Sequence, residues 1–147
     1  MVYLSYFFKK LLVSIVLLGS PVLAFAATLS VSPASGSFTV GNTITVNIQV
    51  NTQGSASDGV DVRYLNFNPA QLQVIDENTS LSGVKITAGT LMQNTHTNSV
   101  DNTAGRATFS QVQTGGTTFT NSTSQTLATL RFTVVGTGTA SVTFSHT

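Results

Sequence analysis

Apolar and polar residues alternate with a period of two in residues 44–50 and again in residues 128–134. Because successive side chains of a β-strand point to opposite faces, both segments are predicted to be strands with one buried face. No stretch longer than a turn or two repeats apolar residues at helical spacing, and Gly- and Asn-containing segments separate the short apolar ones. We therefore predict an all-β sandwich of about eight or nine strands.

Residues 65–74 predict a tight corner between two of these strands. Leu65 and Phe67 alternate with polar neighbours, an Asn-Pro dipeptide follows, and Leu72 and Val74 resume the alternation. Proline biases the residue before it away from helical backbone angles, and Asn-Pro favours the start of a turn. The first strand therefore ends at the dipeptide, and the second begins directly after it.

The strand that leads into this corner changes parity part of the way along. Val60 and Val62 share one parity, whereas Leu65 and Phe67 share the other. A regular strand would expose one of these two pairs, but one extra residue restores the alternation. We therefore predict a β-bulge near Arg63 and Tyr64, which would turn all four apolar side chains inward.

Composition narrows the class of protein. Charged residues make up only 7% of the chain, which is rich in Thr, Ser, Asn and Gly and has neither Cys nor Trp. Absence of Cys excludes disulfides, thiol catalysis, cysteine zinc sites and a lipoprotein anchor. Without the leader lysines Lys9 and Lys10, acidic residues outnumber basic ones by one. No basic face is predicted, which argues against nucleic acid as a partner.

The first 26 residues have the features of a secretory signal peptide. Two lysines precede the apolar run 11–18, and Gly19, Pro21 and the small-x-small sequence at 24–26 follow. The run is well short of the roughly 20 apolar residues of a spanning helix, so an uncleaved membrane anchor is the weaker alternative. We predict a leader at 1–26, one domain at 27–147, and a secreted or cell-surface location.

The corner and the order of the late strands resemble the cohesin family of secreted bacterial β-sandwich domains. The corner Leu-x-Phe-Asn-Pro-x-x-Leu-x-Val has Phe67 where the family usually has Tyr and Asn68 where it usually has Asp. The late part shows Gly-x-Ala-x-Phe-Ser at 105–110, the alternating strand at 128–134, and Gly-Thr-Ala-Ser-Val-Thr-Phe at 138–144. The resemblance implies a jelly-roll sandwich and a non-catalytic module that docks a dockerin-type protein in a surface or polysaccharide-degrading assembly.

Candidate contact residues follow from the bulge. In the family, the partner-facing sheet carries polar side chains on the strand that leads into the corner. With the one-residue shift, Asp61, Tyr64 and Asn66 fall on or near the same surface. We predict that these three residues form part of a polar protein-binding face, although Asp61 would also serve simply to keep that face hydrated.

An enzyme is not predicted, and neither is a cofactor. His96 lies in a Thr- and Asn-rich segment and His146 is the penultimate residue, and neither sits in the sequence context of a recognisable catalytic nucleophile. The carboxylate pairs Asp58 with Asp61 and Asp76 with Glu77 lie in stretches typical of turns.

A calcium site is a further candidate. Residues 93–102 form a long polar segment that is expected to be a loop, and Asn98, Asp101 and Asn102 offer oxygen ligands in it. Their spacing does not fit an EF-hand, and the same residues make a good turn. Both interpretations stay open.

Two other functions remain as alternatives. Carbohydrate-binding modules usually present exposed aromatic rings, but Tyr64 is the one Tyr outside the leader and the phenylalanines at 67, 109, 132 and 144 have inward parity. Phe119 is the other ring that could be exposed, and a polar groove for a polysaccharide chain is a further option. The last alternative is a structural or adhesin domain of a larger cell-surface protein.

Overall fold

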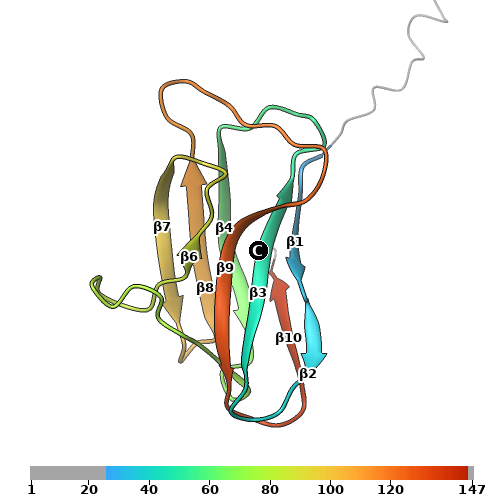
Figure 1. Ribbon diagram of the computed structural model, residues 1–147, viewed down its shortest axis with the longest axis vertical. Helices are drawn as coiled ribbons and strands as arrows, with labels where there is room; N and C mark the ends of the chain where they lie inside the picture. Colours follow the sequence, from blue (N-terminus) through green and yellow to red (C-terminus); the bar gives the residue numbers. More distant parts are fainter. Residues whose placement is uncertain (1–25, 146–147) are drawn as a thin grey trace, which may run out of the picture.

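A computed structural model describes residues 26–145, which form ten β-strands in two five-stranded sheets (Figure 1). The strands are β1 (Thr28–Ser32), β2 (Ser35–Ser37), β3 (Thr43–Asn51), β4 (Gly59–Phe67), β5 (Leu72–Val74), β6 (Thr87–Ala88), β7 (Asn94–Asp101), β8 (Arg106–Val112), β9 (Gln125–Val134) and β10 (Thr139–Phe144). The predicted all-β sandwich is confirmed. The leader predicted at 1–26, apart from Ala26, and His146 lie outside the described residues. Within residues 26–145, no helix is long and apolar enough to cross a membrane.

The two sheets lie face to face, and all of their strand pairs are antiparallel. One sheet has the order β1-β3-β9-β5, with β6 also paired to β9, and the other has the order β2-β10-β4-β8-β7. Strands distant in sequence are therefore neighbours, as β3 and β9 are in the centre of Figure 1. The two segments with the strictest alternation became β3 and β9, the longest pair of adjacent strands.

The core lies between the sheets and is built from the inward parity of each strand. Phe109 and Phe132 are fully buried, and the ring of Phe132 packs edge-to-face on Phe67 from the opposite sheet, with the ring centres 5.1 Å apart. Phe144 is half-buried and packs against the same core. Phe119, considered as an exposed ring, is also half-buried against the core, so it offers little free aromatic surface.

The predicted corner is confirmed, and it carries the chain from one sheet to the other. The backbone oxygen of Asn68 accepts hydrogen bonds from the amides of Gln71 and Leu72 at 3.0 and 2.9 Å, and its side-chain oxygen accepts one from Ala70. The turn ends β4 and begins β5, which pairs with β9 in the other sheet. Because Phe67 and Leu72 flank this turn and are both buried, the corner is anchored in the core.

The segment 93–102, expected to be a polar loop, is instead mostly the edge strand β7. It pairs with β8 along its whole length, and Val100 is the one member of β7 that is fully buried. An edge strand needs only one neighbour, and polar side chains on it oppose further strand pairing. Apolar alternation is therefore weak there, which is why the sequence pattern missed this strand.

We expect the corner residues to be essential for stability. Phe67→Ala and Leu72→Ala should each lower the free energy of unfolding by about 2–5 kcal/mol, because each removes buried apolar volume and leaves a cavity. Chemical denaturation measures this change. Val135→Ala is the control, since Val135 is 44% exposed and its truncation should cost less than about 0.5 kcal/mol. Equal stabilities of the Phe67 and Val135 variants would contradict the role of the corner.

Candidate protein-binding face

The predicted β-bulge lies in β4, between Val62 and Leu65. The pairing of β4 with β8 shifts register there, so Arg63 and Tyr64 form the irregular part of the strand. Val62, Leu65 and Phe67 are buried on the inner side of the sheet, and Val60 is half-buried. The predicted bulge is therefore confirmed: it turns all four apolar side chains inward, and three of them are fully buried.

The bulge places the three predicted contact residues on one outward surface. Asp61 pairs with Ser110 and Asn66 pairs with Arg106, and these two β8 residues have the same parity. Tyr64 belongs to the same surface because the guanidinium carbon of Arg106 lies 4.7 Å from the centre of its ring. Asp61 is exposed, whereas Tyr64 and Asn66 are half-buried by their neighbours. We call the outward side of β10, β4, β8 and β7 the β4 face.

Several members of the β4 face were not predicted from the sequence to be contact residues. They are Arg63 on β4, Arg106, Thr108 and Ser110 on β8, Ser99 and Asp101 on β7, and Thr143 on β10. The alternation of Arg, Thr and Ser with buried Ala107 and Phe109 was a usable signal for β8. The β7 members carried no such signal, because that strand has little apolar alternation.

The β4 face has hollows and charges but no internal ion pair. A shallow basin of about 510 Å³ is lined in part by Asp61, Arg63, His96 and Ser110. Among the described residues, the one salt bridge within 4.0 Å joins Glu77 to Arg131, and β9 carries Arg131 in the other sheet. The charged groups of the β4 face are therefore not neutralised by one another and can pair with groups on a partner.

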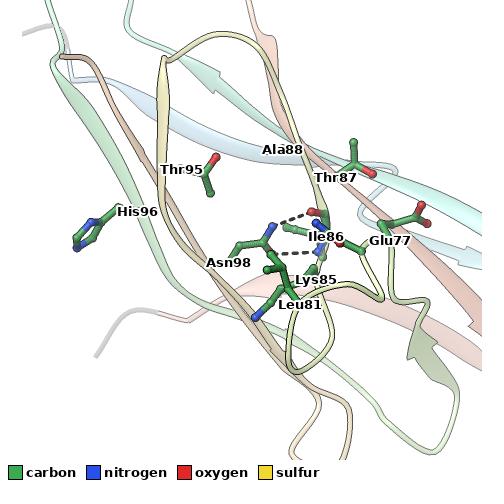
Figure 2. Close-up of a pocket in the computed structure, with 10 residues that line it drawn as sticks. Glu77, Leu81, Lys85, Ile86, Thr87, Ala88, Thr95, His96 and Asn98 are labelled. Atoms are coloured by element: carbon green, nitrogen blue, oxygen red, sulfur yellow. Dashed lines mark hydrogen bonds between the residues drawn. The ribbon is translucent and has the colours of Figure 1, made fainter.

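The calcium candidates are bonded to backbone at three different places. Asn98 accepts from the amide of Ile86 at 3.0 Å and donates to its carbonyl at 2.8 Å (Figure 2). Asn102 makes the same pair of bonds with Val74, at 2.8 and 2.9 Å. The carboxylate of Asp101 accepts from two amides of the following turn. These side chains fasten loops to the sandwich, and calcium binding by them stays a prediction. Among residues 26–145, no three His, Asp or Glu side chains gather as a metal-binding group.

The residues considered for catalysis fall into two groups: Asp58, Asp61 and His96 line the basin of the β4 face, and Asp76 and Glu77 lie in the loop after β5. His96 is exposed at an irregularity in β7, where the pairing shifts between Thr95 and Thr97. Glu77 is paired with Arg131, and Asp76 accepts hydrogen bonds from the amides of two loop residues. Because Asp76 and Glu77 are both engaged in holding the loop, they do not form a pair poised for acid-base chemistry.

A second hollow lies between β7 and the excursion 75–89 (Figure 2). It has a volume of about 510 Å³ and is lined in part by Glu77, Leu81, Lys85 and His96. None of the described residues that line it is Phe, Tyr or Trp, so it lacks the ring platform on which sugars commonly stack.

Comparison with known proteins supports the fold through structure alone. No protein-family model matches the chain, and no curated protein matches it significantly. A type II cohesin domain from the cellulosome of Acetivibrio cellulolyticus matches with a TM-score of 0.57 and 18% identity, covering 83% of this chain and 75% of that one. The second type II cohesin module of a cellulosomal adaptor scaffoldin from that organism gives 0.58 and 17%, covering 86% and 78%.

A third similar structure is a type II cohesin-X-dockerin complex from the same organism, with a TM-score of 0.56 and 18% identity over 83% of this chain and 78% of that one. At these identities the likeness shows the fold, and it confirms the family resemblance at that level. The chain has a cohesin-type β-sandwich fold.

The paired backbone hydrogen bonds of Asn98 and Asn102 allow a test that separates a structural role from calcium binding. Asn98→Ala should lower the free energy of unfolding by about 1–3 kcal/mol, because the amide and carbonyl of Ile86 would lose their partners. Asn94→Ala, at an exposed position of the same strand, should cost less than about 0.5 kcal/mol. Thermal or chemical unfolding with and without calcium is the measurement. A calcium-dependent stabilisation that vanishes in Asn98→Ala would show that Asn98 serves mainly to bind the metal and not to hold Ile86.

Proposed function

We propose that this chain is a non-catalytic extracellular module that binds a protein partner of the dockerin kind through the β4 face. The observation that carries the proposal is the bulge in β4, which brings Asp61, Tyr64 and Asn66 onto one sheet surface together with Arg106. The cohesin-type fold supports it, because one of the similar structures is a cohesin in complex with a dockerin.

The chemistry of the β4 face suits a protein partner. Tyr and Arg are enriched among the residues that dominate binding energy at protein interfaces, and Tyr64 and Arg106 stack on each other near the middle of the sheet. Around them, the Ser and Thr side chains are short, so they protrude little and offer hydroxyl groups for hydrogen bonds. The unpaired charges of Asp61 and Arg63 would contribute mainly to partner selection and to the rate of association.

The proposed setting is a secreted or cell-surface assembly, such as one that degrades polysaccharide. The predicted leader at 1–26 supports export, and the similar cohesins include modules described as cellulosomal. Membrane association would come through an uncleaved leader or through an anchor encoded beyond Thr147.

Direct carbohydrate binding is less favoured than protein binding. The guanidinium of Arg106 covers one face of the Tyr64 ring, so that face is not free for a sugar. The other aromatic side chains of the described domain pack against the core. An adhesin role would use the same sandwich without the β4 face, and it would be favoured if the domain bound neither a dockerin nor a glycan.

We expect the β4 face to lose its partner when Asp61 and Tyr64 are truncated. Calorimetric titration against a panel of dockerin proteins, including type II X-dockerin pairs, should show saturable binding by the wild type. The double variant Asp61→Ala with Tyr64→Ala should weaken it about tenfold or more, because losing an interface anchor costs on the order of 2 kcal/mol.

Thr45→Ala is the matched control, since Thr45 is exposed on the outer side of the other sheet and should leave affinity unchanged. Equal affinity of the wild type and the double variant would refute the assignment of the face. Glycan binding measured in parallel, without binding to any dockerin, would favour the carbohydrate alternative.

A further prediction concerns export. When the chain is expressed in a secreting bacterial host, the exported protein should begin at Ala27, because small residues at 24 and 26 form the expected cleavage site. Intact-mass measurement of the exported fraction decides this. A mature form that keeps residues 11–18 and stays with the membrane would instead identify the leader as an anchor.

A further inference from the structure

The chain contains two Asn-x-Ser/Thr triplets, the acceptor pattern for N-linked glycans. They are Asn78-Thr79-Ser80 and Asn121-Ser122-Thr123. The pattern requires an accessible Asn in a surface loop of an exported protein, because the sugar is attached to the side-chain amide nitrogen. The structure places the two Asn side chains in opposite environments.

Asn121 is closed to modification. Asn121 is buried, with only 7% of the residue exposed. Its nitrogen Nδ2 donates to the carbonyl of Val50 at 2.8 Å, and its oxygen Oδ1 accepts from the amide of Thr52 at 2.6 Å. Both ends of the side-chain amide are therefore used to close the core next to β3.

Asn78 is open. It lies in the excursion between β5 and β6, which projects away from both sheets beside β7 (Figure 1). Asn78, Thr79 and Ser80 are all exposed, and among the described residues Nδ2 of Asn78 donates no hydrogen bond. The nucleophilic nitrogen is thus free on an accessible loop.

The local turn also arranges the acceptor residues. Oδ1 of Asn78 accepts a hydrogen bond from the amide of Ser80 at 3.2 Å, and the amide of Asn78 donates to Asp76 at 3.1 Å. The first bond forms an Asx-turn, which holds the third residue of the triplet beside the side-chain amide.

We propose that Asn78 is an acceptor for an N-linked glycan, delivered by a bacterial-type oligosaccharyltransferase from a lipid-diphosphate-linked oligosaccharide. In this reaction Nδ2 bonds to the anomeric carbon of the sugar while the bond from that carbon to the diphosphate oxygen breaks. The amide nitrogen loses one proton to a base of the transferase, and the lipid diphosphate leaves, with no change in oxidation state. In the cell this rests on the export that forms part of the proposed function.

The test uses the folded chain in a purified reaction, so that its result does not depend on export or on a partner. The protein is incubated with a bacterial N-linking transferase and its lipid-linked donor, and intact mass and glycopeptide sequencing report the product. The wild type should gain one glycan at Asn78, and Asn121 should stay unmodified.

Two substitutions of Ser80 provide matched controls. Ser80→Ala keeps the amide that closes the turn but removes the hydroxyl, and it should reduce modification at least tenfold. Ser80→Thr preserves the acceptor pattern and should be modified as the wild type is, whereas Asn78→Gln should gain nothing.

A peptide with the sequence of residues 74–82 serves as the unfolded reference. If the transferase modifies the peptide but not the folded protein, the loop is not an acceptor and the proposal is wrong. Failure of both overturns it as well, because the sequence itself is then not recognised. Modification of Asn121 in the folded protein would refute the argument from burial.

Discussion

The register shift in β4 is the constraint on which the rest of the structure depends. Val62 and Leu65 can both be buried only because the strand gains an irregular residue between them. Without that shift, either the first part of β4 or the part next to the corner would expose its apolar side chains to solvent. The reason is that a shift of one residue moves every side chain of a strand to the opposite face. The same local event buries Phe67 against Phe132 of the other sheet and presents Asp61 and Asn66 outward. Core and candidate binding face are thus two consequences of one bulge.

A second group of interactions fastens the irregular parts of the chain to this frame. The excursion between β5 and β7 buries the side chains of Ile86 and Met92, and side-chain amides hold the backbone around it in place. Asn98 binds both polar groups of Ile86, Asn102 binds both polar groups of Val74, and Gln111 donates to the carbonyl of Gly89. An amide side chain that pairs with both the amide and the carbonyl of one residue imitates a strand neighbour. The loops therefore have satisfied backbone groups without extending either sheet.

The surface of the sandwich divides into regions with different chemistry. The β4 face combines a stacked Tyr64–Arg106 pair with unpaired charges, which suits recognition of another protein. The excursion beside β7 carries the exposed triplet 78–80, and its amide chemistry suits covalent attachment of sugar. The two proposals use different residues, so a glycan on Asn78 and a partner on the β4 face would be independent properties of one scaffold.

The sequence by itself determined the class of fold, the corner and the bulge, because each of these follows from how apolar and polar residues alternate along a short stretch of chain. The alternation in β3 and β9, the Asn-Pro dipeptide and the change of parity between Val62 and Leu65 all predicted what the structure contains. Only the tertiary structure decided that the polar segment 94–101 is a strand, because it is held mainly by pairing with β8 and Val100 is its one buried residue. It also decided the roles of Asn98 and Asn102, and the opposite exposure of Asn78 and Asn121. A polar side chain has the same local sequence signature whether it binds solvent, a ligand or a distant stretch of backbone, and only packing distinguishes these states.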